Sequence, residues 1–144
     1  MDINIDRYIV DSLTDYGRGV NTERQLASEV DGLKNVYRRV IYTAMKFGNK
    51  LTKTAAISGT TIATVHPHSS DAVDAVVSSL VRWGIFEGQG NHGMKMIYGD
   101  DIAPSSSRYT EAKINSTWSK IFSNLMEYVP YKEAEIEGNV EPEI

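Results

Sequence analysis

Hydrophobic residues recur at the spacing of an α-helix in three separate stretches of the chain. The first stretch predicts a helix that Asp31 caps and that ends near Gly48, with an apolar stripe of Val36, Val40, Ile41, Ala44 and Met45. Residues 51–64 predict a second, weaker helix with Ala55, Ala56, Ile57 and Ile62 facing inward, and Pro67 ends it. Residues 69–71 can cap a third helix, whose stripe is Val73, Val76, Val77, Leu80 and Val81.

The pattern then changes character. Residues 84–99 are rich in glycine, and residues 94–98 alternate like a short strand. Helical spacing returns over 110–126, with Ile114, Trp118, Ile121, Phe122 and Leu125 on one face. Two short helices, a turn and a strand-bearing segment are the order of a winged helix-turn-helix, whose second helix lies in the major groove of DNA. We therefore expect an α+β, mainly helical winged-helix fold, similar to that of catabolite activator proteins.

Length and composition exclude several classes of protein. The 144 residues suffice for one domain with a sizeable core, and 41% of them are hydrophobic. No apolar run approaches the roughly 20 residues of a membrane-spanning helix, and the first residues lack the features of a secretory signal. The absence of cysteine excludes disulfides, thiolate metal sites and a cysteine nucleophile, and it fits a reducing compartment. We expect a cytoplasmic protein that does not bind membranes.

Charge is distributed unevenly along the chain. The net charge of −4 by itself argues against a nucleic-acid partner. However, residues 32–70 hold six basic residues and no acid, whereas residues 127–144 hold six acids against Lys132 alone. The basic stretch is a candidate phosphate-binding face. The alternative is a solvated helix face whose counter-charges come from elsewhere in the fold.

Four short strings carry a specific resemblance. Residues 31–45 read DGLKNVYRRVIYTAM, residues 65–73 read VHPHSSDAV, residues 88–93 read GQGNHG and residues 108–113 read RYTEAK. In this order and spacing they resemble the breakage-reunion domain of type IIA DNA topoisomerases, which reads DGLKPVHRR, YHPHGD, DGQGNFGS and RYTE. The group includes the gyrase A and topoisomerase IV C subunits and their phage equivalents. The likeness covers residues 12–126.

The resemblance implies a DNA-gate domain and assigns roles to individual residues. Tyr109 matches the tyrosine that attacks a DNA phosphate and becomes linked to the 5′ end of the cut strand, and Arg108 matches the arginine that stabilises the transition state. The further residues that match the family's active site are Arg24, Lys34 and His66. The residues that we expect to contact DNA are Arg38, Arg39, His68, Lys46, Lys53, Gln89 and Asn91.

The resemblance also implies partners. In the family two protomers cut both strands of a duplex, so a homodimer is expected in the full-length assembly. Mg²⁺ and ATP are bound by a gyrase B-like partner or domain, whose toprim part supplies the metal. We expect no metal site in this chain, because a His-x-His pair such as His66 and His68 without a third ligand is a weak signal. A zinc site that adds His92 is less favoured than a packing role for that histidine.

The residue types suit this chemistry. Transesterification at a phosphodiester needs an oxygen nucleophile and positive charge on the developing pentavalent phosphate. Only about 0.1% of a free tyrosine is phenolate at pH 7, so Arg108 and nearby histidine and lysine side chains would favour the anion. Phenolate is also a good leaving group, which makes resealing easy.

Some residues depart from the family pattern. Ser69 and Ser70 replace Gly-Asp, Tyr37 replaces histidine and Asn35 replaces proline. These departures are typical of a divergent member, such as one encoded by a virus or a mobile element. We expect an N-terminal arm over 1–30, a winged-helix domain over 31–126, and a loosely held acidic tail over 127–144 at the start of a missing tower domain.

Two other functions stay open. A catalytically inactive relic would bind DNA or a partner protein without cutting. An unrelated helical DNA-binding regulator would be indifferent to the replacement of Tyr109 by phenylalanine.

Overall fold

The structure is a computed structural model that describes residues 5–22 and 26–143. The chain divides into two compact units, Met1–Asn35 and Val36–Ile144. Within the described residues, no helix combines the length and the apolar character that crossing a bilayer requires.

The first unit contains helix α1 (Ile5–Val20), which the sequence analysis did not predict. None of the residues of α1 is buried, and its apolar side chains, including Tyr8, Leu13 and Tyr16, are exposed. Beyond this helix, Gly32 adopts a φ of 69° in a turn, where Leu33 N donates to Asp31 Oδ1 at 2.9 Å. Asp31 therefore stabilises a turn rather than the helix that follows, which begins four residues later.

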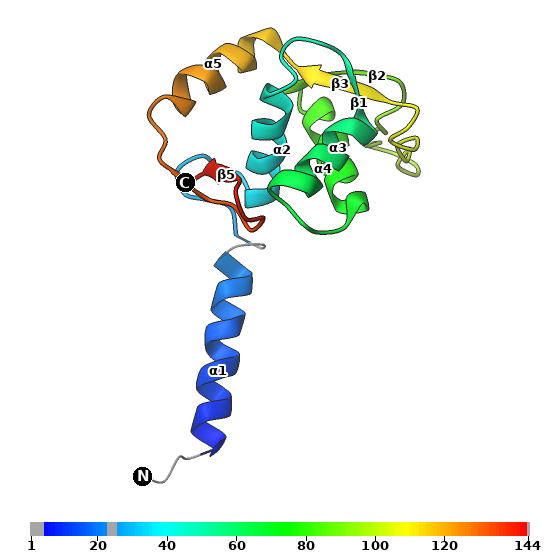
Figure 1. Cartoon of the computed structure of the whole chain (residues 1–144). Helices are drawn as coiled ribbons and strands as arrows, with labels where there is room; N and C mark the ends of the chain where they lie inside the picture. Colours follow the sequence, from blue (N-terminus) through cyan, green and yellow to red (C-terminus); the bar gives the residue numbers. More distant parts are fainter. Residues whose placement is uncertain (1–4, 23–25, 144) are drawn as a thin grey trace. The chain divides into compact units, whose positions relative to one another are not determined.

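Three helices of the second unit form its core (Figure 1). They are α2 (Asn35–Met45), α3 (Thr54–Thr64) and α4 (Ser70–Arg82). Four residues of the predicted α4 stripe are buried, which confirms that stripe. The buried hydrophobic residues of these helices are Val40, Ile41, Ala44, Ile57, Val73, Val76, Val77 and Leu80.

A small antiparallel sheet completes the fold beside these helices. It has the order β1-β3-β2 and consists of β1 (Thr52–Lys53), β2 (Phe86–Gln89) and β3 (Glu111–Ile114). Phe86 pairs with Ile114, and both side chains are buried against the helices. The succession of helix, strand, two helices and two strands confirms the α+β, winged-helix expectation.

The strands lie at positions that the sequence analysis assigned differently. Residues 110–126 do not form one helix, because 111–114 are strand β3 and α5 (Ser116–Met126) begins only after Asn115, whose side chain accepts from Thr117 N. The predicted strand at 94–98 is reduced to a single bridge between Met94 and Ile102. Alternation and helical spacing overlap over such short runs, so pairing across the sheet decided the outcome.

Inward and outward positions also differ from the prediction on two helices. Arg38 and Arg39, expected off the apolar stripe of α2, are 5% and 8% exposed. Ala55 and Ala56 are exposed on α3, where Thr54, Ser58 and Thr61 are buried instead. Small hydroxyl side chains can be buried when they hydrogen-bond locally, as Thr61 does to Ile57 O at 2.8 Å.

The acidic tail is not loosely held. Strands β4 (Tyr131–Glu133) and β5 (Val140–Pro142) form an antiparallel hairpin, with Gly138 in the turn at a φ of 79°. Ala134 is 7% exposed and Glu141 only 4% exposed, so the hairpin is anchored by buried groups. The prediction of a loosely held tail was wrong for this hairpin, because Glu135 and Glu141 pair with Arg39 of α2, whereas Glu133, Glu137 and Glu143 are exposed to solvent.

Candidate functional site

Tyr109 lies in a turn that is fastened to the beginning of α3. Tyr109 N donates to Ser106 O at 2.9 Å, which closes the turn. On either side, Ser107 O accepts from Ala55 N at 3.2 Å and Thr110 O accepts from Thr54 N at 2.9 Å. The first N–H groups of a helix have no partner within the helix, and here the tyrosine-bearing segment supplies the acceptors.

A buried pair of hydroxyl groups reinforces this attachment. Thr110 Oγ1 donates to Thr54 Oγ1 at 2.8 Å, although the two residues are 56 positions apart in the sequence. Thr110 is 2% exposed and Thr54 is 1% exposed. The residue next to Tyr109 is therefore fixed by both its backbone and its side chain.

The loop after β2 packs against the same segment. Gly90 has a φ of +95°, and a Cβ atom there would lie 3.2 Å from Tyr109 O, so the close approach requires glycine. Asn91 Nδ2 donates to Ala103 O at 3.1 Å, and Asn91 O accepts from Ser105 N at 2.9 Å. Asn91 thus holds the two ends of the 92–104 loop together, while Gln89 is exposed at the end of β2.

The side chain of Tyr109 itself is open to solvent. It is 70% exposed, and the guanidinium carbon of Arg108 lies 5.6 Å from the centre of its ring. Arg108 Nε donates to Ser106 Oγ at 3.3 Å, on the surface of the same turn. A rigid backbone therefore presents an accessible phenol with one cation beside it.

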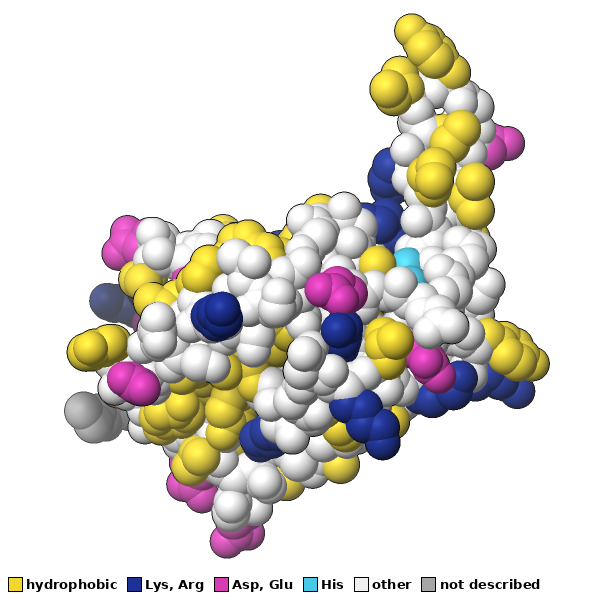
Figure 2. Space-filling view, turned by 90° about the horizontal axis from the view of Figure 1, so that it is seen from above, with side chains coloured by type: hydrophobic (Ala, Val, Ile, Leu, Met, Phe, Trp, Pro, Cys, Tyr) yellow, Lys and Arg dark blue, Asp and Glu magenta, His cyan; other side chains and the backbone are white. Residues whose placement is uncertain are grey.

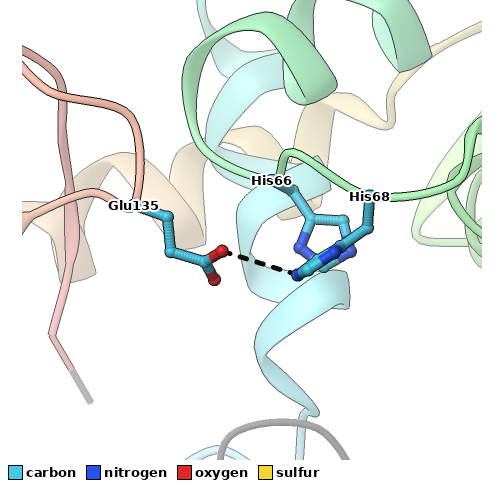
Figure 3. A group of neighbouring side chains, drawn as sticks. All are labelled: His66, His68 and Glu135. Carbon is cyan, nitrogen blue, oxygen red and sulfur yellow. Dashed lines mark ion pairs between the residues drawn. The ribbon is translucent and has the colours of Figure 1, made fainter.

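A second cluster forms around Arg39 of α2. Its guanidinium binds Glu141 through two hydrogen bonds, Nε to Oε2 at 2.5 Å and Nη2 to Oε1 at 2.9 Å. Its Nη1 lies 2.8 Å from Glu135 Oε1 and 2.9 Å from His66 Nδ1. Figure 3 shows Glu135 approaching from the C-terminal hairpin while His66 and His68 project from the loop after α3, with His68 Nε2 3.5 Å from Glu135 Oε2.

The charges of this cluster stabilise one another. Burial opposes the charged form of Arg39, but its hydrogen bonds to Glu141 and Glu135 and their charges outweigh burial and raise the pKa of Arg39. Burial likewise opposes ionisation of Glu135, but the hydrogen bond and charge of Arg39, with smaller contributions from His68 and His66, lower the pKa of Glu135. Arg39 and Glu135 are therefore both charged at neutral pH.

His66, His68 and Glu135 also form the one group with metal-ligand atoms that the described residues bring together, within 4.8 Å of one another. The group fits a metal ion poorly, because the guanidinium of Arg39 already lies against both Glu135 and His66. Mg²⁺ prefers a shell of oxygen ligands, which two imidazoles do not provide. His92 does not belong to the group: it is 5% exposed and its Nε2 lies 3.0 Å from Glu111 O, consistent with packing.

The two clusters lie at opposite ends of α3. Tyr109 is attached at Thr54, where α3 begins, whereas His66 follows its last residue, Thr64. A helix of 11 residues rises about 15 Å from first to last residue. The expected gathering of arginine and imidazole groups around one phenol is therefore not what the chain forms: Arg108 is beside Tyr109, and the imidazoles are with Arg39.

The remaining basic candidates are dispersed. Lys53 pairs with Glu111 at 2.7 Å, and Lys46 lies 4.4 Å from the ring centre of Tyr42. Arg38 is buried, Lys34 is exposed in the first unit, and Arg24 lies outside the described residues. On the face drawn in Figure 2, basic and acidic side chains are interspersed with hydrophobic ones and form no continuous basic field. Counter-charges from β3 and the hairpin thus neutralise part of the basic stretch.

The sequence analysis missed Thr54, Glu135 and Glu141. The hydroxyl pair has no local signature, because its members are far apart in the chain. The two glutamates had a signal that was available: an acidic terminal segment and an acid-free basic stretch in one small domain are complementary in charge.

Fold and site together define a winged-helix protein with an exposed tyrosine, flanked by an arginine, on a rigid turn. A family model for the A subunit of DNA gyrase and topoisomerase IV matches residues 24–144. The chain belongs to this family. It is 35% identical to the DNA gyrase A subunit of Haemophilus influenzae and 34% identical to that of Escherichia coli, each over 132 residues and 85% of this chain. The Campylobacter jejuni protein is 34% identical over 97% of this chain. This chain spans 14%, 15% and 17% of these three relatives.

Proposed function

We propose that this chain is a DNA-gate module of a type IIA topoisomerase, in which Tyr109 makes a transient covalent bond to DNA. The observation that carries the proposal is the exposed phenol of Tyr109 on a segment hydrogen-bonded to Thr54 and Ala55, with Arg108 beside its ring. A nucleophile for a bulky duplex must be accessible, and its backbone must not move during the attack.

The chemical step is an exchange of one phosphodiester for another. The phenol oxygen of Tyr109 loses its proton and attacks the phosphorus, and the bond from phosphorus to the 3′ oxygen breaks. The products are a phosphotyrosyl bond at the 5′ end and a free 3′ hydroxyl, which takes up a proton. The reverse attack by that hydroxyl restores the DNA, and Arg108 stabilises the charge on phosphate in both directions.

Partners complete the proposed reaction. Among the described residues, only Arg108 places a cation beside the Tyr109 ring, and a pentavalent phosphate needs more positive charge than one arginine supplies. We therefore propose that a second copy of the chain or a gyrase B-like protein brings further positive groups. Mg²⁺ and ATP belong to that toprim-bearing partner in this proposal, as the resemblance to the family implies. We keep Arg24 and Lys34 as proposed active-site residues. The residues that remain proposed DNA contacts are Arg38, Lys46, Lys53, His68, Gln89 and Asn91. Cellular DNA as substrate implies a cytoplasmic location.

A covalent-adduct experiment tests the proposal. The chain is mixed with a gyrase B protein, Mg²⁺ and DNA labelled at the 3′ end of the expected cut strand, because that end stays on the fragment bound to the tyrosine, and the mixture is then denatured. Label that stays on the protein is expected with the natural sequence and is expected to vanish with Tyr109→Phe, while DNA binding by that variant stays near normal. Tyr98→Phe is the matched control, because Tyr98 is also a strongly exposed phenol and lies in the 92–104 loop. Adduct formation by Tyr109→Phe would refute the assignment.

A second candidate function is a DNA- or partner-binding relic without cleavage. It is favoured by one observation: Arg39 and His66, which match residues of the family's cleavage site, are engaged with each other and with hairpin carboxylates. This alternative predicts salt-dependent DNA binding with no adduct under any condition in the experiment above.

A further inference from the structure

Arg39 uses nearly all of its hydrogen-bonding capacity inside the protein. An arginine side chain has five N–H donors and no acceptor. Four of the five are used: two on Glu141, one on Glu135 and one on His66. With an exposed fraction of 8%, this guanidinium has little left to offer a DNA phosphate.

The contact with His66 has a consequence for the imidazole. Because the guanidinium can only donate, His66 Nδ1 must be the acceptor at 2.9 Å. A neutral imidazole with an unprotonated Nδ1 carries its proton on Nε2. A free neutral imidazole exchanges between two tautomers, whereas this contact selects one of them.

The two hairpin glutamates determine where the guanidinium lies. Glu141 is 4% exposed, and its carboxylate accepts two hydrogen bonds from Arg39, which fixes the plane of the guanidinium. Glu135 takes the second hydrogen of Nη1, so the first points to the imidazole. The hairpin begins about 65 residues after His66, so only the folded chain makes this connection.

We propose that Glu141 and Glu135 are positioning residues that act through Arg39 to hold His66 as the Nε2–H tautomer. His66 then presents a hydrogen-bond donor at Nε2, which suits an acceptor such as a phosphate oxygen. That the acceptor is DNA phosphate rests on the proposed function, whereas the tautomer itself does not.

The tautomer is measured in the free chain. Long-range ¹H–¹⁵N spectra of histidine-labelled protein at neutral pH distinguish protonated from unprotonated ring nitrogens. The natural sequence is expected to show a single His66 species with the proton on Nε2. Glu141→Gln is expected to convert it into an exchanging mixture, and Glu133→Gln, which changes an exposed carboxylate of the same hairpin, is expected to leave it unchanged. A proton on Nδ1 in the natural sequence overturns the proposal, as does a Glu141→Gln spectrum identical to the natural one.

If Glu141→Gln does not fold, as judged by circular dichroism, Glu135→Gln takes its place, because Glu135 is only partly buried and holds Arg39 by one bond. An exchanging mixture of His66 tautomers in Glu135→Gln then supports the proposal, and a spectrum identical to that of the natural sequence overturns it.

Two variants of His66 test whether its Nε2–H group donates to DNA. Asparagine places its oxygen near Nδ1 and can still accept from Arg39, whereas glutamine places its amide N–H near Nε2. His66→Asn should therefore keep stability but lose about tenfold in adduct formation, the scale of one hydrogen bond. His66→Gln should lose stability and form more adduct than His66→Asn does. Equal behaviour of the two variants refutes the donor role. If the natural sequence forms no adduct, the proposed function fails with the donor role, while the spectra still decide the positioning by the glutamates.

Discussion

The Tyr109 turn and the Arg39 cluster differ in which part of the residue is held in place and which part is exposed. At Tyr109 the backbone is fixed by hydrogen bonds to α3, and the functional side chain is left 70% exposed. At Arg39 the side chains themselves are fixed, and an 8% exposed cation is paired with two carboxylates and an imidazole. The difference shows that a cation predicted to bind a ligand can instead form its hydrogen bonds and ion pairs within the protein.

The largest expected effect is a loss of unfolding free energy when Arg39 is replaced, because this residue belongs to the buried cluster. Arg39→Met leaves the buried carboxylate of Glu141 without its main partner, which costs about 3–5 kcal/mol of unfolding free energy. Urea denaturation measures this loss, and Lys50→Met, which removes an exposed cation, serves as the control. The double variant Arg39→Met/Glu141→Leu should recover much of the stability, because it removes both buried charges. A double variant as unstable as the single one would show that packing, not charge, sets the loss.

At the Tyr109 turn, the largest expected effect is on adduct formation rather than on stability. Arg108→Ala removes the cation beside the Tyr109 ring and should reduce adduct formation about 10²–10³-fold. Because the side-chain contacts of Arg108 lie at the surface, the denaturation midpoint should stay near that of the natural sequence. Adduct yield and urea denaturation on the same preparations check both statements. A large loss of stability with unchanged cleavage would reverse the distinction between the regions.

The attachment of Tyr109 to α3 should give an intermediate effect. Thr110→Val removes the hydroxyl that bonds Thr54 and leaves a buried Oγ1 without its partner, at a cost of about 1–3 kcal/mol. Thr110→Ser keeps the hydroxyl and is the matched control. Amide hydrogen exchange at Thr54 and Ala55 should accelerate in Thr110→Val but not in Thr110→Ser. Unchanged exchange in both would mean that the backbone bonds alone hold the turn.

The smallest effect is a pH dependence of the Arg39 cluster. The pKa of Glu135 is lowered in the folded state below its ordinary value of 4.5, so its contribution is present above that value and is lost as pH falls through the folded pKa. Because Glu135 is partly exposed, this contribution is below about 1 kcal/mol. The stability difference between the natural sequence and Glu135→Gln should shrink from pH 6 towards pH 3 in urea denaturation. A difference that stays constant with pH would contradict the charged pairing.

Helix α4 shows what the apolar periodicity of a single helix can predict. Its stripe of Val73, Val76, Val77 and Leu80 is both periodic and buried, so the pattern predicted element and face together. On α2 the same reasoning found the helix but placed Arg38 and Arg39 outside. Arg39 is buried because Glu135 and Glu141, far away in the chain, pair with it. The pattern of one helix carries no information about such partners.

The helices of the core, the winged-helix order and the family could be predicted from the sequence, because apolar periodicity and short strings such as RYTE are local properties. Three features became visible only in the folded chain: β3 is a strand, the acidic tail forms a hairpin, and Arg39 faces Glu141, 102 positions away. Strand pairing and buried ion pairs depend on contacts between distant segments, whose geometry exists only once the core has formed.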